Sequence, residues 1–210
     1  MQKLILIGGG GHCKVCIDII EQTGQYHIAG ILDAANLIGT EVLGYKIIGT
    51  DEDIWKYAGQ DYQFLITVGQ IKTATVRKKI YQLLKEQNCT LATVFSPKAT
   101  VSSYARIGEG TIIMHHAIVN AAAEIGVNCI LNTGCDIEHD VIVGQHTHIS
   151  TYAVINGGSH IGKETFIGSN ATVSNQISLT DQVIIGSGAV VHRNIAAPGT
   201  YAGNPVKKIN

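Results

Sequence analysis

The chain has 210 residues, a formal net charge of −1 and 45% hydrophobic residues. The balanced charge provides no basic face of the kind that nucleic-acid binding requires, and no apolar run approaches the ~18 residues of a membrane-spanning helix. We therefore expect no nucleic-acid partner and no membrane partner. The five cysteines, an odd number, are typical of free thiols in a reducing compartment, so we expect a cytoplasmic protein.

The first predicted elements are a strand over residues 3–7 and a helix that ends near Thr23, joined by a glycine-rich turn. The start of the chain is interpreted as this strand and not as a signal peptide. Strand, glycine turn and helix open a nucleotide-binding βαβ unit, because glycines let the backbone approach an anion at the helix N-terminus. The full glycine fingerprint is incomplete, since Cys13 stands where its last glycine belongs. A tight turn without a ligand therefore remains an alternative.

A second predicted strand covers residues 27–32 and ends at Asp33. An acid about 20 residues beyond the glycine loop meets the ribose hydroxyls in such folds. A strand-ending Asp without a ligand is the alternative. The next expected elements are a short strand within 42–49, a short helix over 51–58 with Asp51 as N-cap, a strand over 64–68 closed by Gly69, a helix over 73–87 and a strand over 90–95.

Cys13 and Cys16 form a C-x-x-C pair on the first predicted helix. One pair cannot complete a zinc site, and the sequence has no second pair. A redox role would require a thioredoxin-like setting. We interpret both as small helix residues and expect no metal.

Every sixth residue from Val101 to Val191 is aliphatic, sixteen in succession. A helix period of 3.6 or a strand period of 2 cannot explain this pattern, whereas hexads are typical of a parallel β-helix. We expect the aliphatic residues to point into a three-sided prism, with small residues near its corners and glycines easing its turns. The prediction is an α/β, Rossmann-like βαβ nucleotide-binding domain over 1–96, followed over 97–210 by a parallel β-helix of hexapeptide repeats and a C-terminal tail.

His139 is the candidate base among the histidines of the coil, because it lies between Glu138 and Asp140. A neighbouring acid can orient the ring and raise its basicity. Successive residues of a straight strand point to opposite faces, so pairing of His139 with Asp140 requires a corner. Cys135 occupies one of the small near-corner positions, and we do not expect it to act as a nucleophile.

Several motifs together carry a resemblance that covers the whole chain: the Gly-Gly-His loop at 10–12, Asp33, Val68-Gly69, and the stretches 113–120 (IMHHAIVN), 130–139 (ILNTGCDIEH) and 202–207 (AGNPVK). In these features the chain resembles the nucleotide-sugar acetyltransferases of the PglD and NeuD type. The resemblance implies that the β-helix is left-handed. It also implies a homotrimer that binds acetyl-CoA between adjacent coils, so that the active site lies at a subunit interface.

The resemblance also implies roles for individual residues. By position, His139 is the general base and Asp140 its orienting acid. The acetyl-CoA groove is implied for His148, Gly157, Ser169 and Ser187, and the nucleotide-sugar site for Gly10, Gly11, His12, Asp33, Gly69 and Asn132. Ser169 and Ser187 are eighteen residues apart, so they stack in consecutive coils, as a pantetheine along the prism axis would require.

The preferred hypothesis is an acetyl-CoA-dependent N-acetyltransferase that acts on the 4-amino group of a nucleotide-linked 4-amino-4,6-dideoxy sugar for surface-glycan biosynthesis. UDP and dTDP are the preferred nucleotides, and GDP stays open. One alternative is an O-acetyltransferase of sialic acid or a related sugar acid, because the stretch 149–169 also resembles the NeuD type. The other alternative is a non-catalytic β-helix protein that binds a nucleotide sugar.

Overall fold

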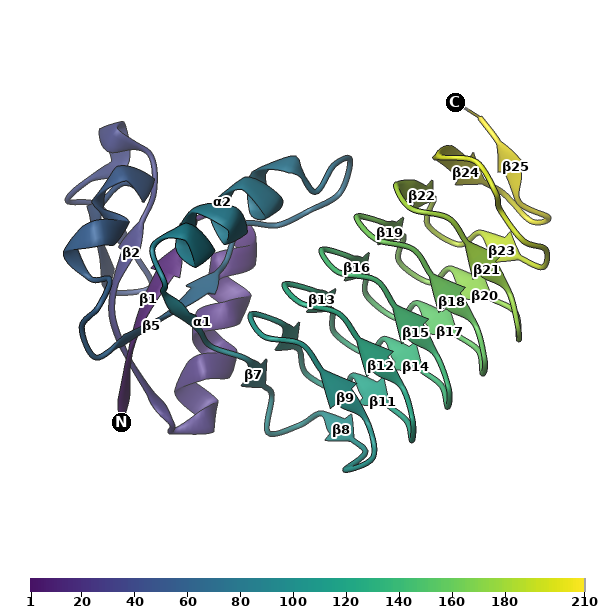
Figure 1. Ribbon diagram of the computed structural model, residues 1–210, viewed down its shortest axis with the longest axis horizontal. Helices are drawn as coiled ribbons and strands as arrows, with labels where there is room; N and C mark the ends of the chain where they lie inside the picture. The colour runs from purple at the N-terminus through teal and green to yellow at the C-terminus, as the bar shows by residue number, and fades with distance from the viewer. Residues whose placement is uncertain (210) are drawn as a thin grey trace.

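The computed structural model describes residues 1–209 and shows an α/β unit followed by a stack of three-sided coils (Figure 1). The α/β unit contains β1 (Gln2–Ile7), α1 (Gly11–Thr23), β2 (Tyr26–Leu32), the 3-10 helix η1 (Ala35–Leu37), β3 (Glu41–Val42), β4 (Tyr45–Gly49), the 3-10 helix η2 (Asp51–Lys56), β5 (Tyr62–Ile66), α2 (Thr75–Glu86) and β6 (Thr90–Leu91).

The sheet of this unit has the strand order β3-β4-β2-β1-β5-β6 and is parallel except for the β3–β4 hairpin. Alternate residues of β1 face opposite sides, as the pleat requires. Leu4 and Leu6 pack with α1, whereas Ile5 and Ile7 pack with α2. The two helices therefore cover opposite faces, and the strand order reverses at β1, which lies between β2 and β5.

The predicted strands and helices of this unit are confirmed to within a few residues, with two corrections. Thr50 caps η2 in place of Asp51, because the Thr50 hydroxyl accepts from Glu52 N and its own N–H donates to the Asp53 carboxylate. The strand expected over 90–95 is divided. Thr90–Leu91 closes the α/β sheet, whereas Val94–Phe95 is the first strand of the coil.

Three sheets of mainly parallel strands form the coil. The first coil sheet contains β7 (Val94–Phe95), β10 (Ile112–Ile113), β13 (Ile130–Leu131), β16 (His148–Ile149), β19 (Phe166–Ile167), β22 (Val183–Ile185), β24 (Gly199–Ala202) and β25 (Lys207–Lys208). The second contains β8 (Thr100–Val101), β11 (Ile118–Val119), β14 (Asp136–Ile137), β17 (Val154–Ile155), β20 (Thr172–Val173) and β23 (Val190–Val191). The third contains β9 (Arg106–Ile107), β12 (Glu124–Ile125), β15 (Ile142–Val143), β18 (His160–Ile161) and β21 (Ser178–Leu179).

The chain visits the three sheets in this order and then starts again, so each coil has three corners. We call the turn from the first to the second sheet the first corner, the turn from the second to the third sheet the second corner, and the remaining turn the third corner. The second corner lies opposite the first coil sheet across the prism. This geometry decides which side chains of one chain can meet.

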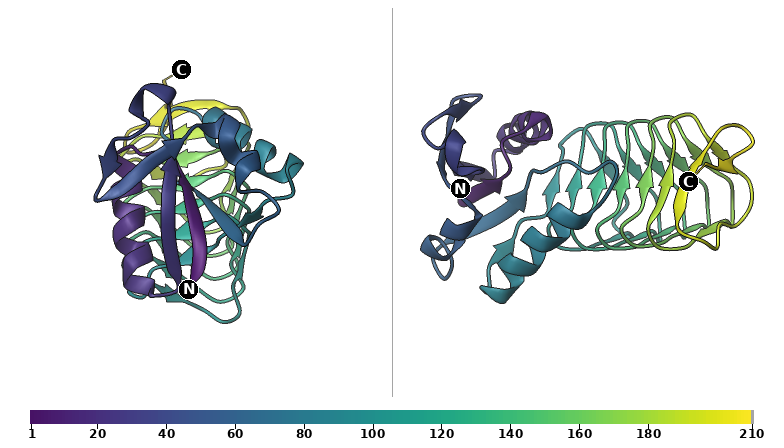
Figure 2. Two further views of the ribbon diagram at one scale, coloured as in Figure 1. Left: turned by 90° about the vertical axis from the view of Figure 1, so that its left-hand side faces the viewer. Right: turned by 90° about the horizontal axis from the view of Figure 1, so that it is seen from above.

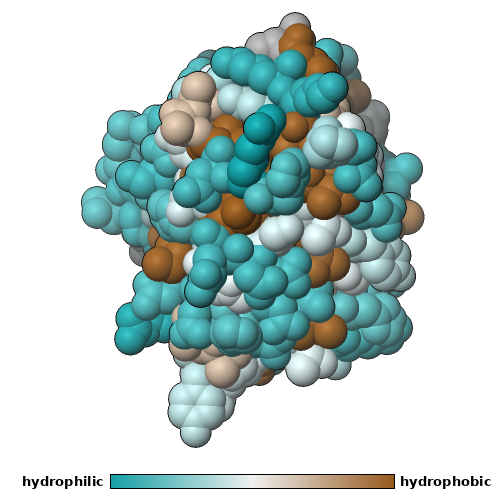
Figure 3. All heavy atoms as spheres, turned by 90° about the vertical axis from the view of Figure 1, so that its right-hand side faces the viewer, coloured by the Kyte–Doolittle hydropathy of each residue, from teal (hydrophilic) through white to brown (hydrophobic). Residues whose placement is uncertain are grey.

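The aliphatic residues at every sixth position fill the prism, as predicted. All of them from Ile113 to Val191 are buried, and Val101 and Ile107 are partly buried at the end of the stack. At the other end, the β24–β25 hairpin covers the last coil and buries Val206. Seen from that end, the surface is mostly hydrophilic with separate hydrophobic patches (Figure 3).

The glycines that recur every eighteen residues do not ease the turns, contrary to the expectation. Gly108 and Gly144 have no left-handed φ. A Cβ on Gly108 would lie 2.6 Å from the carbonyl carbon of Gly126, and one on Gly144 would lie 2.6 Å from Lys163 N. These glycines let consecutive coils approach each other at the third corner. The left-handed turn positions are held by other glycines, such as Gly134 at φ 66°, where the expectation is confirmed, and by residues such as Asp140 at φ 59°.

The α/β unit lies at the N-terminal end of the stack (Figure 2) and contacts the first coil sheet. On one side, α1 packs against the outward side chains of Ile112 and Ile130. At the first corner beside this contact, Nε2 of His115 lies 3.1 Å from an Asp18 carboxylate oxygen of α1. The apolar outward residues of this sheet are therefore explained by the helix that covers them.

On the other side, α2 runs along the third corner of several coils. Lys85 and Tyr81 bind Glu109 at 2.8 and 2.7 Å, and Lys78 binds Glu164 at 2.6 Å. Glu109 and Glu164 belong to different coils, so α2 is bonded to the stack at two positions along its length. The α/β unit and the coil are thereby fixed against each other.

Candidate active site

His139 and Asp140 form a hydrogen-bonded pair at the second corner, between β14 and β15. Asp140 has a φ of 59°, and this left-handed turn brings its Oδ2 to 2.7 Å from His139 Nδ1. The corner that the pairing required is confirmed. The hydrogen bond to Asp140 raises the pKa of His139 above its usual value. Nδ1–H donates to the carboxylate, which leaves Nε2 free to accept a proton, and both side chains are exposed.

Gly157 lies directly against the His139 ring. A Cβ on Gly157 would be 2.6 Å from His139 Nε2 and 2.7 Å from Cε1. The neighbouring Gly158 N–H donates to the His139 carbonyl at 3.0 Å. The structure thus places Gly157, expected in the cofactor groove, beside the nitrogen that would act as base. Only a residue without a side chain leaves room for the ring in this position.

His148 has the opposite environment. It is 6% exposed, and burial lowers its pKa to about 4. Its Nδ1 lies 2.6 Å from the carbonyl oxygen of Gln70 and must carry the proton of that hydrogen bond, so Nε2 accepts from Asn132 Nδ2 at 3.0 Å. The structure brings His148 and Asn132 together, although the sequence assigned them to different ligands. His148 is a fixed neutral group and not a second base.

Ser169 and Ser187 stack at the first corner in consecutive coils, as their spacing predicted. Ser169 Oγ lies 3.0 Å from Ser150 Oγ, and Ser187 is exposed one coil further on. Asn132 occupies the same corner in an earlier coil. His139 and Gly157, in contrast, lie at the second corner. The predicted residues of the coil therefore form two groups, at different corners of the prism.

The glycine loop, Asp33 and Gly69 meet at the carboxyl ends of β1, β2 and β5. Asp33 accepts hydrogen bonds from Gly9 N and from Ala34 N, which ties the end of β2 to the loop. A Cβ on Gly69 would be in contact with His12 Cβ at 3.6 Å. In open α/β sheets, ligands bind at this edge, where the connections leave in opposite directions.

Gly10 and Gly11 keep the start of α1 open. A Cβ on either residue would meet no atom within 4 Å, and no side chain caps the helix at Gly10. His12, the next residue, is largely enclosed, and burial lowers its pKa to about 3. The first turn of α1 therefore presents unobstructed backbone amides with a neutral imidazole beside them, an arrangement suited to an anion.

A crevice of about 790 Å³ lies at the same edge, between the strand ends and α2. Gly8 and Asp33 line it from the strand ends, Asp51 from the start of η2 and Lys79 from α2. Asp51 and Lys79 were not found from the sequence, because they come from separate elements that only the fold brings together. For Lys79, the one indication available from the sequence was the helix that follows β5 and crosses onto this face of the sheet.

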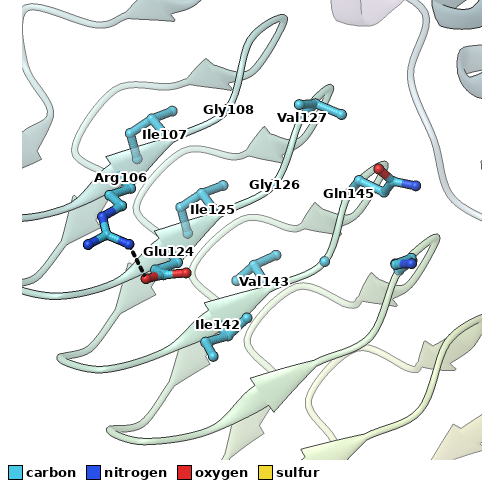
Figure 4. A pocket seen from close by; sticks show the side chains of 12 residues that line it. Arg106, Ile107, Gly108, Glu124, Ile125, Gly126, Val127, Ile142, Val143 and Gln145 are labelled. Carbon is cyan, nitrogen blue, oxygen red and sulfur yellow. Dashed lines mark hydrogen bonds and ion pairs between the residues drawn. The ribbon is translucent and has the colours of Figure 1, made fainter.

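A second, shallower hollow of about 450 Å³ lies outside the third coil sheet, beside Gly108, Gly126 and Gly144 (Figure 4). Arg106 and Glu124 form an ion pair of 2.8 Å at its rim. Ile142 lies on its floor and is 45% exposed. None of the predicted site residues lines this hollow.

The cysteines are buried, and none forms a disulfide. Burial raises the pKa of Cys13 to about 11 and raises those of Cys16 and Cys135 further, so these thiols stay protonated. Within residues 1–209, no group of three or more His, Cys, Asp or Glu side chains is placed to hold a metal ion. No helix in the described part of the chain is long and apolar enough to cross a membrane.

A nucleotide-binding α/β unit joined to a hexapeptide β-helix with an exposed histidine–carboxylate pair defines a class, the hexapeptide-repeat acyltransferases with an N-terminal nucleotide-binding domain. Residues 3–84 match the family described as the PglD N-terminal domain. The chain belongs to the PglD-like family of nucleotide-sugar acetyltransferases. This membership confirms both the resemblance found in the sequence and the left-handed β-helix.

Three relatives illustrate this membership. The UDP-N-acetylbacillosamine N-acetyltransferase of Bacillus subtilis is 32% identical over 126 residues, in a match that covers 54% of this chain and 52% of that protein. The chain thus spans about half the length of this curated relative. The acetyltransferase domain of PglB from Neisseria gonorrhoeae, solved with acetyl coenzyme A, is 31% identical with a TM-score of 0.91, and 99% of each chain is covered.

The third relative is the perosamine N-acetyltransferase of Caulobacter crescentus. A variant of it with one histidine replaced by asparagine was solved with CoA and GDP-perosamine. It is 29% identical with a TM-score of 0.93, and the match covers 99% of this chain and 97% of that one.

Proposed function

We propose that this protein transfers the acetyl group of acetyl-CoA to the 4-amino group of a nucleotide-linked 4-amino-4,6-dideoxy sugar. The single observation that carries the proposal is the exposed His139–Asp140 pair on a coil that is joined to an α/β unit with a crevice at its strand ends. Relatives solved with acetyl coenzyme A and with GDP-perosamine support it. The product would be an acetamido sugar for surface-glycan biosynthesis.

In the proposed reaction, the sugar amine attacks the thioester carbonyl while His139 Nε2 removes a proton from the nitrogen. Asp140 holds Nδ1–H and stabilises the imidazolium that forms. The backbone of Gly157 lies against the His139 ring, and we assign its N–H to the oxyanion of the tetrahedral intermediate. Collapse of this intermediate breaks the C–S bond, and His139 returns the proton to the CoA thiolate. No acetyl-enzyme is needed, and the buried, protonated Cys135 is not placed to form one.

The crevice at the strand ends would hold the nucleotide. Asp33 is suited to accept from the ribose hydroxyls, and the open backbone at Gly10 and Gly11 is suited to the pyrophosphate. Lys79 supplies a positive charge on the α2 wall of the crevice. UDP and dTDP remain the preferred nucleotides, with GDP included because one relative binds GDP-perosamine.

We further propose that the enzyme is a cytoplasmic homotrimer whose active site is shared between chains. His139 lies across the prism from the α/β unit, so the base of one chain faces away from its own nucleotide crevice. A neighbouring copy could place its first corner, with Asn132, Ser169 and Ser187, against this His139. Light scattering should then give three times the 22.4 kDa chain mass. A monomeric mass for active protein would contradict the shared site.

The function is tested by following CoA thiol release from acetyl-CoA with a panel of acceptors. We expect release with a 4-amino-4,6-dideoxy sugar linked to UDP, dTDP or GDP, and none with the matching 4-hydroxy sugar. Release that depends on sialic acid would replace the proposal by O-acetylation. No release with any acceptor, together with binding of a nucleotide sugar, would indicate a non-catalytic binding protein.

A further inference from the structure

The loop between β5 and α2 touches both candidate sites. Gly69 lies at the nucleotide edge of the sheet, and the next residue, Gln70, lies on the coil. Gln70 is only 3% exposed, whereas the adjacent Ile71 is 66% exposed. A connecting loop normally runs over the surface, so the burial of this single polar side chain has a specific cause.

The cause is a set of hydrogen bonds to the coil. Gln70 Nε2 donates to the carbonyl oxygens of His146 at 3.0 Å and Thr165 at 3.3 Å, which belong to consecutive coils. The main-chain carbonyl oxygen of Gln70 accepts from His148 Nδ1 at 2.6 Å. Three contacts from one residue fix the height of the loop along the stack.

These contacts extend to Asn132 at the first corner. Because Gln70 accepts from Nδ1, His148 must present an unprotonated Nε2, and this nitrogen accepts from Asn132 Nδ2. If the Gln70 carbonyl moved away, the proton of His148 could shift to Nε2, where it would face the Asn132 amide donors. The position of the loop therefore selects the tautomer of His148 and, through it, the orientation of Asn132.

Arg77 of α2 braces the start of the same loop. The side chain is fully buried, and Nη1 donates to the carbonyl oxygens of Ile66 and Val68 at 2.8 and 2.7 Å. Nη2 donates to Asn128 of the coil through its carbonyl at 3.2 Å and through its side-chain oxygen. None of the groups it binds is a carboxylate. A buried cation is costly unless it is well hydrogen-bonded, and here every bond joins the loop or the coil.

We propose that Gln70 is a positioning residue of the acetyl transfer, with Arg77 as its brace. Gln70 holds the nucleotide-sugar loop at a fixed place on the coil and, through the tautomer of His148, orients Asn132 toward the sugar. The nucleotide unit is thereby aligned with the first corner, where the acceptor amine must be presented. This inference rests on the proposed function for its catalytic meaning, but the link from Gln70 to His148 exists without any substrate.

The test compares the full-length variants Gln70→Ala and Ile71→Ala in steady-state acetyl transfer. For Gln70→Ala we expect kcat/KM for the nucleotide-linked amino sugar to fall about tenfold, as for the loss of buried hydrogen bonds. The KM for acetyl-CoA should change less than this, because the His148 ring stays buried in its place and only its tautomer changes. Ile71→Ala, its exposed neighbour in the loop, should match the unsubstituted protein in both parameters.

The second readout is the ¹⁵N spectrum of the His148 ring in the substrate-free protein. The unsubstituted protein and Ile71→Ala should show a single tautomer with the proton on Nδ1, constant between pH 6 and 8. Gln70→Ala keeps the main-chain carbonyl but loses the two side-chain bonds that hold this carbonyl in place on the coil. It should therefore show a mixture of tautomers or a titration in this range. If Gln70→Ala does not fold, Gln70→Met serves instead, because it keeps the side-chain length and loses only the amide.

The outcomes separate the two proposals. If Gln70 variants keep unsubstituted kinetics and a single His148 tautomer, the positioning role is wrong, whatever the enzyme acetylates. If the unsubstituted protein releases no CoA with any acceptor but the His148 tautomer still depends on Gln70, the proposed function fails while the link between loop and coil stands. An equal loss of kcat/KM in Gln70→Ala and Ile71→Ala would show that any change in the loop impairs activity, and it would overturn the specific role of Gln70.

Discussion

The second corner and the junction beneath the α/β unit each hold a histidine, and the two environments have opposite consequences. His139 is exposed and bonded to a carboxylate, which raises its pKa. His148 is buried between a carbonyl oxygen and an amide, and burial lowers its pKa to about 4. At neutral pH the first can gain and lose a proton, whereas the second can only hold a neighbour in place. The environment, and not the residue type, decides which histidine can act as the base.

The largest effect should come from removing the base itself. For His139→Ala we expect kcat to fall about 10²- to 10⁴-fold, the usual contribution of a positioned general base. The KM for both substrates should change little, since the imidazole acts on the reacting proton. His160→Ala, an exposed coil histidine, is the matched control and should keep full activity. Near-normal turnover of His139→Ala would show that another group is the base.

The buried His148 should instead affect how the stability of the folded protein depends on pH. Because the folded pKa of His148 lies below its unfolded value of about 6.5, the unfolded chain binds more protons between pH 6.5 and about 4. Unfolding is therefore favoured as the pH falls through this window. The loss of stability reaches up to about 3 kcal/mol, because each unit of pKa shift corresponds to about 1.36 kcal/mol. His12 and His146 shift in the same direction.

Thermal or urea unfolding between pH 7 and 4.5 measures this effect. We expect His148→Gln to be less stable at neutral pH but to lose less stability on acidification than the unsubstituted protein. His160→Gln should leave the pH dependence as it is. An unchanged slope in His148→Gln would mean that the pKa of His148 is the same in the folded and the unfolded protein.

The next effect concerns the position of the His139 ring. Gly157→Ala places a methyl group where the ring lies, since a Cβ there would be 2.6 Å from Nε2. A displacement of about 1 Å can cost about 10²-fold in rate, so kcat should fall by about that factor. Gly158→Ala introduces strain at φ 67° but meets no part of the ring, which makes it a stability control. Full activity in Gly157→Ala would place the reacting ring elsewhere.

The smallest effect should come from the partner of the base. Asp140→Asn replaces the carboxylate that raises the pKa of His139, so the pH at which activity is lost on acidification should move downward. We expect kcat to fall about tenfold, less than the 10²- to 10⁴-fold loss of the base itself, because the imidazole stays in place. A pH–rate profile with the same acidic limb as the unsubstituted protein would show that Asp140 does not set the basicity of His139.

Much of the fold was predictable because it depends on periodic burial. The aliphatic residue at every sixth position determines which side chains enter the prism, and this pattern is visible without coordinates. The His139–Asp140 pair was also predictable, since two adjacent polar residues can pair only at a corner. The division of residues 90–95 was not, because two short strands joined by a sharp change of direction have the same composition as one longer strand.

The junction between the two units could not be predicted from local patterns. Gln70 and Arg77 are separated in sequence from the carbonyl groups that they bind, and nothing near them indicates burial. The role of Gly108 was misjudged for the same reason, because its constraint comes from the neighbouring coil and not from its own backbone angles. Contacts between coils and between units are long-range, and a single sequence does not display them.

The most direct test follows His139 and His148 together by ¹⁵N NMR as the pH is varied, beside the pH dependence of kcat/KM. The account predicts that His139 titrates above pH 6.5 at the same pH as the acidic limb of the rate profile, while His148 stays neutral with its proton on Nδ1 down to about pH 5. The account would be contradicted if His148 titrated with the rate profile while His139 did not.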